Sequence, residues 1–203
     1  MHTGQDGSSA QSTEDLGIFR TLPEVTVMTP SDRNSARSLT RKLLDHPKPS
    51  YTRTARNKTR EIYTEEEAEA LEIGKASVLR EGADASIIAC GVMVERALEA
   101  AETLAAKGID TMVIDMHTIK PIDREAIIRA ASRGAIVTAE DHSVMGGLGS
   151  AVAEVLVEEA PTMMRMIGVR DKFGESGSPM DIMDKMGLTS ENIASKLEEL
   201  LSK

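Results

Sequence analysis

The fold class follows from residues 85–115, which read ASIIACGVMVERALEAAETLAAKGIDTMVID. Two short apolar runs, Ala85–Ala89 and Thr111–Asp115, flank an Ala-, Leu- and Glu-rich stretch from Met93 to Lys107. The apolar runs have the length of buried strands, the middle stretch has the composition of a helix, and Gly108 stands where helices commonly end. Because a helical crossover joins parallel strands, the stretch predicts a strand–helix–strand unit of a parallel sheet.

The same alternation continues to the carboxyl end of the chain. The pattern predicts helices from Asp123 to about Arg133 and from Gly149 to about Glu159, strands at Ala135–Thr138 and Met164–Val169, a loop at Arg170–Pro179 and two final helical segments, the last at Ser190–Leu201. A lead-in strand is predicted within Gly74–Leu79. Continuous apolar strands separated by helices are typical of a mainly parallel sheet with helices on both faces, so we expect an α/β fold.

The first 70 residues hold fewer elements. Short strands are predicted at Val25–Thr29 and Ser50–Thr54, with a helix between them that starts at Ser31 or Asp32 and ends near Leu44. The polar stretch Ala55–Ala70, with its run of glutamates, is typical of a solvated face or a linker. We therefore predict a partial α/β domain plus linker over residues 1–70 and a complete domain over residues 71–203.

Composition excludes several functional classes. The chain has 203 residues and a formal net charge of −9, which disfavours nucleic acid and anionic membranes as partners. No apolar run approaches the roughly 18 residues of a membrane span, and the N-terminus lacks an apolar signal core. The single cysteine, Cys90, lies in an apolar run and favours a buried packing role. These features predict a cytoplasmic protein.

Three segments contain candidate functional residues, and each of them also has a purely structural interpretation. Asp6 lies in a Gly-flanked turn and can present a carboxylate to substrate hydroxyls, or it is only part of the turn. Arg53 and Arg56 follow a predicted strand, where a guanidinium can bind a phosphate, or they are surface arginines. Glu140–His142 and Gly146–Gly149 stand between a strand and a helix whose N-terminus can bind an anion, or the glycines only permit a tight turn.

Sequence motifs along the whole chain resemble the transketolase family. The first part, Gly4–Gln11, Glu14–Pro23 and Thr26–Asp32, resembles the later part of the transketolase pyrimidine-binding domain. The second half resembles the transketolase C-terminal domain in Ile87–Gly91, Ile114–Asp123, Thr138–His142, Gly146–Gly149 and Gly174–Gly177. Deoxyxylulose-phosphate synthases and the β subunits of 2-oxo acid dehydrogenases share this architecture, and the Thr118–Asp123 and Glu140–His142 runs favour transketolase proper.

The resemblance implies roles for four residues. Asp6 matches the family aspartate that contacts a substrate hydroxyl, and Arg56 matches the arginine that binds the substrate phosphate. His2 corresponds to a family histidine that stands further from the aspartate in relatives. Many relatives place His or Gln where this chain has Ala10, so neighbouring Gln11 is the expected cofactor contact. No catalytic residue and no metal ligand is expected in this chain.

The resemblance also implies what the chain lacks. The family binds thiamin diphosphate and Mg²⁺ mostly through a separate N-terminal section, and the motif for that site is not recognisable here. We therefore expect the C-terminal section of a transketolase that transfers a two-carbon ketol unit between sugar phosphates, is inactive alone, and assembles with an N-terminal section and into homo-oligomers. The alternatives are a non-catalytic dimerisation or regulatory module, and a nucleotide-binding domain that uses the Gly146–Gly149 turn.

Overall fold

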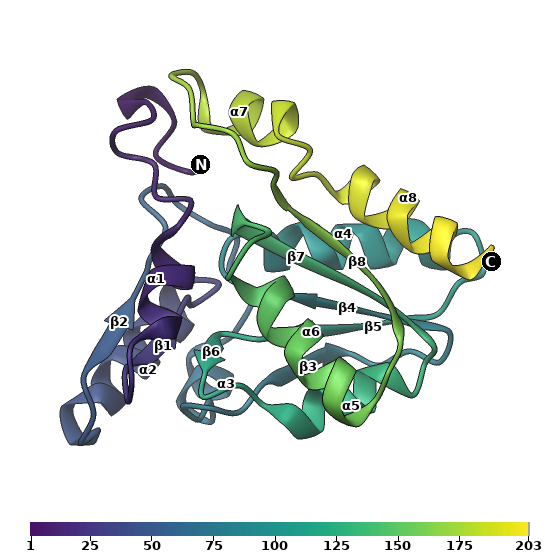
Figure 1. Ribbon diagram of the computed structural model, residues 1–203, viewed down its shortest axis with the longest axis horizontal. Helices are drawn as coiled ribbons and strands as arrows, with labels where there is room; N and C mark the ends of the chain where they lie inside the picture. The colour runs from purple at the N-terminus through teal and green to yellow at the C-terminus, as the bar shows by residue number, and fades with distance from the viewer. Residues whose placement is uncertain (203) are drawn as a thin grey trace.

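Two β-sheets organise the chain (Figure 1). The computed structural model describes residues 1–202. Its larger, five-stranded sheet has the order β3-β5-β4-β7-β8, and its smaller, three-stranded sheet has the order β2-β1-β6. The strands of the larger sheet are β3 (Ser77–Arg80), β4 (Ala85–Ala89), β5 (Thr111–Asp115), β7 (Ala135–Ser143) and β8 (Met163–Val169). Strand β3 pairs antiparallel with β5, and the other pairs are parallel, which confirms the predicted sheet.

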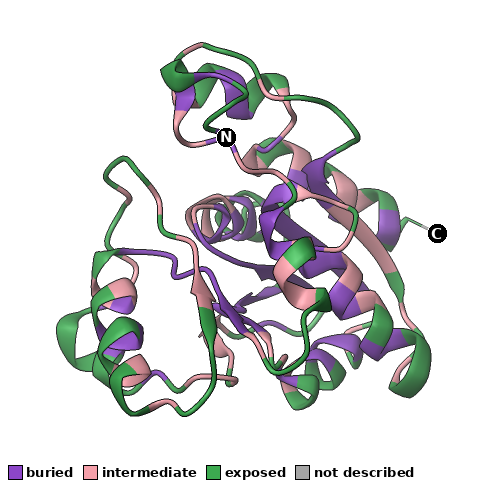
Figure 2. Ribbon diagram, turned by 60° about the vertical axis from the view of Figure 1, so that its left-hand side comes forward, coloured by how far each residue is buried: buried purple, intermediate pink, exposed green. Residues whose placement is uncertain are grey.

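Helices cover both faces of the larger sheet (Figure 1). Helices α4 (Met93–Ala105) and α8 (Ser190–Leu201) cover one face, and α5 (Arg124–Ala131) and α6 (Leu148–Glu159) cover the other. Ile87 packs into the first of these cores and Ile88 into the second, because successive side chains of a strand point to opposite faces. The central strands are buried and the outer faces of the helices are exposed (Figure 2).

The smaller sheet combines strands from both halves of the chain. Strand β1 (Thr26–Met28) pairs parallel with β2 (Ser50–Thr52) and antiparallel with β6 (Thr118–Lys120). The sequence analysis did not predict β6, which is only three residues long and ends before Pro121. Because β6 covers the second edge of β1, the first 70 residues are tied to the larger domain by backbone hydrogen bonds.

Helices complete the N-terminal region. Helix α2 (Arg33–Lys42) begins after Asp32, whose carboxylate accepts from Ser35 N at 2.8 Å, and is followed by the 3₁₀ turn η2 (Leu43–Asp45). A 3₁₀ turn near the N-terminus is η1 (Gly4–Asp6), and helix α7 (Pro179–Lys185) packs on it. Helix α1 (Asp15–Thr21) has no counterpart among the predicted elements.

Two predictions need correction. The stretch Ala55–Ala70 is more than a linker: it contains helix α3 (Glu65–Glu69), and both Tyr63 and Ala68 are buried. Its glutamates do lie on the solvated face. Strand β7 extends beyond the predicted Thr138, so Glu140–His142 are strand residues rather than part of a turn. Among residues 1–202 we find no helix that combines the length and the apolar character needed to cross a bilayer.

Candidate functional site

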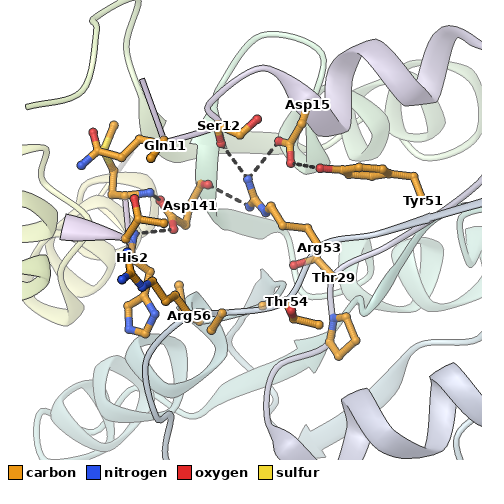
Figure 3. Close-up of a pocket in the computed structure, with 17 residues that line it drawn as sticks. His2, Gln11, Ser12, Asp15, Thr29, Tyr51, Arg53, Thr54, Arg56 and Asp141 are labelled. Atoms are coloured by element: carbon orange, nitrogen blue, oxygen red, sulfur yellow. Dashed lines mark hydrogen bonds and ion pairs between the residues drawn. The ribbon is translucent and has the colours of Figure 1, made fainter. Parts of the chain in front are cut away.

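A pocket of about 200 Å³ opens where the N-terminal turn, the end of β2 and the end of β7 meet (Figure 3). Its walls come from three regions that are far apart in the sequence. Asp15 lies at the start of α1, Tyr51 and Arg53 lie in and just after β2, and Asp141 lies in β7. The pocket therefore forms only when the smaller sheet is docked against the carboxyl end of the larger one.

Arg53 occupies the centre of this arrangement (Figure 3). Its Nη1 donates to Ser12 O and to Asp15 Oδ1, both at 3.0 Å, and its Nη2 donates to Asp141 O at 2.8 Å. A guanidinium carries five N–H donors. Among residues 1–202 these three bonds leave the Nε–H and one Nη2–H of Arg53 without an acceptor. Arg53 is thus held rigidly while keeping two donors for a ligand.

Tyr51 holds Asp15 from the other side. Its hydroxyl donates to Asp15 Oδ2 at 2.6 Å, and its ring stacks on Phe19 with the centroids 3.9 Å apart. Burial, together with the hydrogen bond to Asp15, raises the pKa of Tyr51 to about 12, so the phenol stays protonated. The carboxylate of Asp15 therefore accepts from both Tyr51 and Arg53, which fixes the direction of the guanidinium.

Glu140 and His142 form a buried layer behind the pocket. Glu140 accepts from Leu148 N at 2.7 Å and Gly149 N at 2.8 Å, at the start of α6. Burial outweighs these bonds and raises the pKa of Glu140 to about 7. Burial also lowers the pKa of His142, whose Nδ1 bonds to Ser143 O at 2.7 Å. The N-terminus of α6 is therefore occupied by a side chain of the protein itself, which argues against the nucleotide-binding alternative.

Three of the four predicted site residues line the pocket. His2, Gln11 and Arg56 are part of its wall, and Asp6 is not. The carboxylate of Asp6 instead forms an ion pair with the guanidinium of Arg56. Both of these side chains are largely exposed, so the pair lies at the rim. The structure thus brings Asp6, Arg56 and His2 to one side of the opening.

His2 and Gln11 are held by the surrounding protein. His2 N donates to Asp141 Oδ2 at 3.4 Å, and burial lowers the pKa of its imidazole. Gln11 is 7% exposed, and its Nε2 donates to Gly4 O at 3.3 Å and to Glu175 O at 2.9 Å. The predicted contact between Gln11 and a cofactor stays a prediction.

The sequence analysis did not single out Asp15 or Tyr51, and it named Asp141 only as part of the Glu140–His142 run. One signal could have found part of this set. Tyr51 and Arg53 are two residues apart in an extended segment, and such residues point to the same side. That spacing would have favoured Arg53 over Arg56 as the inward-facing arginine. The contribution of Asp141 depends on how the two sheets dock, which no local pattern reports.

The pocket around Arg53 is small for a whole cofactor. Its volume of about 200 Å³ is below the roughly 300–1,000 Å³ that is usual for cofactor and ligand sites. In residues 1–202 no group of three or more His, Cys, Asp or Glu side chains could hold a metal ion.

Comparison with known proteins places the chain in a family. Residues 74–193 match the family model of the transketolase C-terminal domain, and residues 1–61 match that of the transketolase pyrimidine-binding domain. The chain belongs to the transketolase family. This confirms the resemblance drawn from the motifs, and it accounts for the order of the two sheets along the chain.

Several relatives of this transketolase-family chain carry informative names. It is 44% identical over 196 residues to a 6-deoxy-6-sulfo-D-fructose transketolase subunit of Clostridium sp. (strain MSTE9), covering 96% of this chain and 60% of that protein. It is 40% identical to a putative transketolase C-terminal section of Methanocaldococcus jannaschii, covering 98% and 63%. It is 39% identical to 1-deoxy-D-xylulose-5-phosphate synthase 1 of Geobacter sulfurreducens, covering 98% and 32%.

A solved structure agrees with these matches. It is described as a split gene transketolase in an inactive β4 tetramer, and it superposes on this transketolase-family chain with a TM-score of 0.92 at 43% identity. The match covers 97% of this chain and 64% of the other. The chain thus spans 60–64% of the length of the Clostridium subunit, the Methanocaldococcus section and the solved split-gene structure.

Proposed function

We propose that this chain is the C-terminal section of a thiamin diphosphate-dependent transketolase that transfers a two-carbon ketol unit between sugar phosphates in the cytoplasm. The observation that carries the proposal is the pocket built around Arg53, with two unused guanidinium donors and with Arg56 and His2 at its wall. The names of the relatives that are transketolase subunits or sections support the same conclusion.

We assign roles to Arg53, Arg56 and His2 of the pocket and to Asp6 at its rim. The free Nε–H and Nη2–H of Arg53 bind phosphate oxygens, because a guanidinium fits a phosphate with two donors at once. Arg56 adds charge at the rim, and its ion pair with Asp6 is exchanged for the substrate: Arg56 turns to the phosphate and Asp6 to a hydroxyl. His2 presents a neutral imidazole, since burial lowers its pKa.

The remaining parts of the enzyme come from a partner. An N-terminal transketolase section would hold the diphosphate and Mg²⁺, because the described residues of this chain offer no metal-binding group. When bound there, thiamin diphosphate supplies the carbanion chemistry of ketol transfer. This chain contributes substrate binding. By forming a homo-oligomer, it also contributes part of the scaffold of the assembled enzyme. The isolated chain is expected to be inactive.

The test is reconstitution. The purified chain is assayed for ketol transfer from a ketose phosphate to an aldose phosphate with thiamin diphosphate and Mg²⁺, alone and after mixing with an N-terminal transketolase section. The proposal expects activity only in the mixture, together with a stable complex by native mass measurement. Activity of the chain alone, or no complex and no activity with its partner, would contradict it.

A second candidate reaction follows from the relatives. Synthases of 1-deoxy-D-xylulose 5-phosphate match 96–98% of the chain at 35–39% identity. The β subunits of 2-oxo acid dehydrogenases are a more distant alternative. With a ketose phosphate as donor, the transketolase proposal expects a product ketose phosphate that keeps its C1 hydroxyl. Formation of 1-deoxy-D-xylulose 5-phosphate, which lacks that hydroxyl, from pyruvate and an aldose phosphate would instead favour the synthase.

A non-catalytic dimerisation or regulatory module is the alternative from another class. In such a module, Asp6 and Arg56 would be idle. Replacing each by alanine in the active complex separates the two readings, because a substrate-binding role predicts a higher KM and an idle residue predicts no change.

A further inference from the structure

The N-terminal turn that carries Asp6 is held by a segment from the other end of the chain. The turn comprises residues 1–11, and the segment, residues 170–178, which we call the strap, leads from β8 to α7 (Figure 1). Gln11 joins the two, since its Nε2 donates both to Gly4 O within the turn and to Glu175 O in the strap. The turn has no strand of its own to fix it.

Glycines make this approach possible. A Cβ on Gly4 would lie 2.6 Å from Pro179 Cγ, and a Cβ on Gly7 would lie 2.6 Å from Ser176 Oγ. The contact at Gly4 is with a rigid proline ring, and both glycines also have a positive φ, +58° and +78°, that larger residues rarely adopt. The Gly4–Gly7 motif is therefore packed against the strap at Ser176 and against the start of α7.

The closest of these contacts joins Gly174 and Gln11. A Cβ on Gly174 would overlap Gln11 Oε1 and would lie 2.8 Å from Gln11 Cδ. Gly174 does not have a positive φ, so the requirement for glycine here is one of space and not of backbone conformation. The buried Oε1 of Gln11 has no hydrogen-bond partner in residues 1–202, so the amide is held by its nitrogen and by this contact.

We infer that Gln11 and Gly174 are positioning residues: their contact sets the place of the Gly4–Gly7 part of the turn, and thereby of Asp6, relative to Arg56 and Arg53. The inference rests on the proposed function for its effect on substrate. Gln11 lies in the pocket wall and acts through the turn, and the strap gives the C-terminal domain control over a site that lies mostly in the N-terminal region.

The test uses three variants in the reconstituted two-section complex. Gly174→Ala inserts the methyl group into the space of the Gln11 amide, Gln11→Ala removes the amide, and the double variant does both. We expect Gly174→Ala to raise KM for the sugar phosphate roughly tenfold, because small displacements of positioning groups are costly. The affinity for thiamin diphosphate should stay within twofold. The double variant should match Gln11→Ala, since the methyl group then has room.

A second measurement makes the result independent of activity. Hydrogen exchange of the isolated chain should become faster in residues 1–11 of Gly174→Ala and stay unchanged in β5. Lys172→Ala, an exposed change in the same strap, should alter neither KM nor exchange. Unchanged exchange in Gly174→Ala would overturn the positioning contact. Faster exchange with unchanged KM would overturn the role of the Gln11–Gly174 contact at the site. A wild-type complex without ketol transfer would instead contradict the proposed function. Hydrogen exchange would still test the contact in that case.

Discussion

Tyr63 donates its hydroxyl to Asp115 Oδ2 at 2.9 Å, across the boundary between the first 70 residues and the larger sheet. Ser31 Oγ donates to the same oxygen at 2.8 Å. Asp115 is completely buried at the end of β5, and its Oδ1 has no partner in residues 1–202. Burial, with a smaller contribution from the charge of Asp32, raises the pKa of Asp115 to about 7, although the two hydroxyls lower it.

This pKa predicts a pH-dependent contribution to stability. The carboxyl of Asp115 keeps its proton in the folded chain up to about pH 7 and loses it near pH 3.8 in the unfolded chain. Between these values the folded state binds more protons, so the contribution is fully present below pH 3.8 and is lost as the pH rises to about 7. The slope approaches about 1.4 kcal/mol per pH unit.

The variant Asp115→Asn tests this contribution. The free energy of unfolding of the wild type minus that of the variant should fall between pH 4.5 and 7 and be constant above, as measured by urea denaturation. The difference in unfolding free energy between wild type and variant is used because other buried groups also titrate in this range. Titration of Glu140 lowers stability as the pH rises, and titration of His117, whose pKa burial lowers to about 4, raises it. These contributions are common to both proteins and cancel in the difference. Asp45→Asn, at an exposed carboxylate, should show no such trend, and a flat difference for Asp115→Asn would contradict the assignment.

Glu140→Gln should destabilise the chain. The glutamine keeps the size of the side chain but offers one acceptor to the two backbone N–H groups of Leu148 and Gly149. We expect a loss of about 1–3 kcal/mol at pH 5, where Glu140 is uncharged and the variant relieves no buried charge; this is the usual cost of leaving a buried donor without its acceptor. Urea denaturation measures it. Glu158 lies on the same helix, α6, and Glu158→Gln, which removes an exposed ion pair with Arg124 of α5, should cost less than about 1 kcal/mol; equal losses in the two variants would argue against the buried cap.

Arg56→Ala should separate binding from folding. Its ion pair with Asp6 is exposed, so the free energy of unfolding should change by less than about 1 kcal/mol. If Arg56 contacts the substrate phosphate, KM in the reconstituted complex should rise about tenfold, which corresponds to about 1.4 kcal/mol of binding. Arg60→Ala, an exposed arginine of the same loop, is the matched control. A KM that rises equally in both variants would indicate general electrostatic attraction rather than a contact.

Limited proteolysis should begin between Thr54 and Glu61. The backbone of this loop lies outside every helix and strand, and Arg56, Lys58 and Arg60 are trypsin sites. Beyond it, the N–H groups of Ile62 and Tyr63 are bonded to Asp32 Oδ2 at 2.8 and 3.0 Å. Mass spectrometry of the first fragments locates the cut. A first cut between Ser86 and Val169 would contradict this order of stability.

Much of the larger domain was predictable because its strands and helices have strong local patterns. The run Ala85–Ala89 is apolar except for Ser86 and forms a strand buried on both faces, and Met93–Ala105 forms the helix that its Ala, Leu and Glu content indicates. The short elements were missed for the opposite reason. Strand β6 and helix α3 are too brief for a periodic pattern, and their existence depends on β1 and α2, against which they pack.

The same distinction between local patterns and tertiary contacts applies to the candidate site. The residue types were visible in the sequence: an Asp in a Gly-flanked turn, arginines after a strand, a Glu-Asp-His run. What holds the inward-facing arginine was not visible, because Arg53 is oriented by Ser12 and Asp15 from one segment and by Asp141 from another.

The sequence alone determined the parallel α/β domain, the burial of Cys90 and the family, because each depends on local hydrophobic periodicity or on short motifs in order. Only the tertiary structure decided that β6 completes the N-terminal sheet, that Glu140 occupies the start of α6, and that Gln11 fills the space beside Gly174. These are contacts between residues more than 90 positions apart in the first and last cases, and they arise from steric fit and from the need of buried polar groups for partners, neither of which a linear pattern reports.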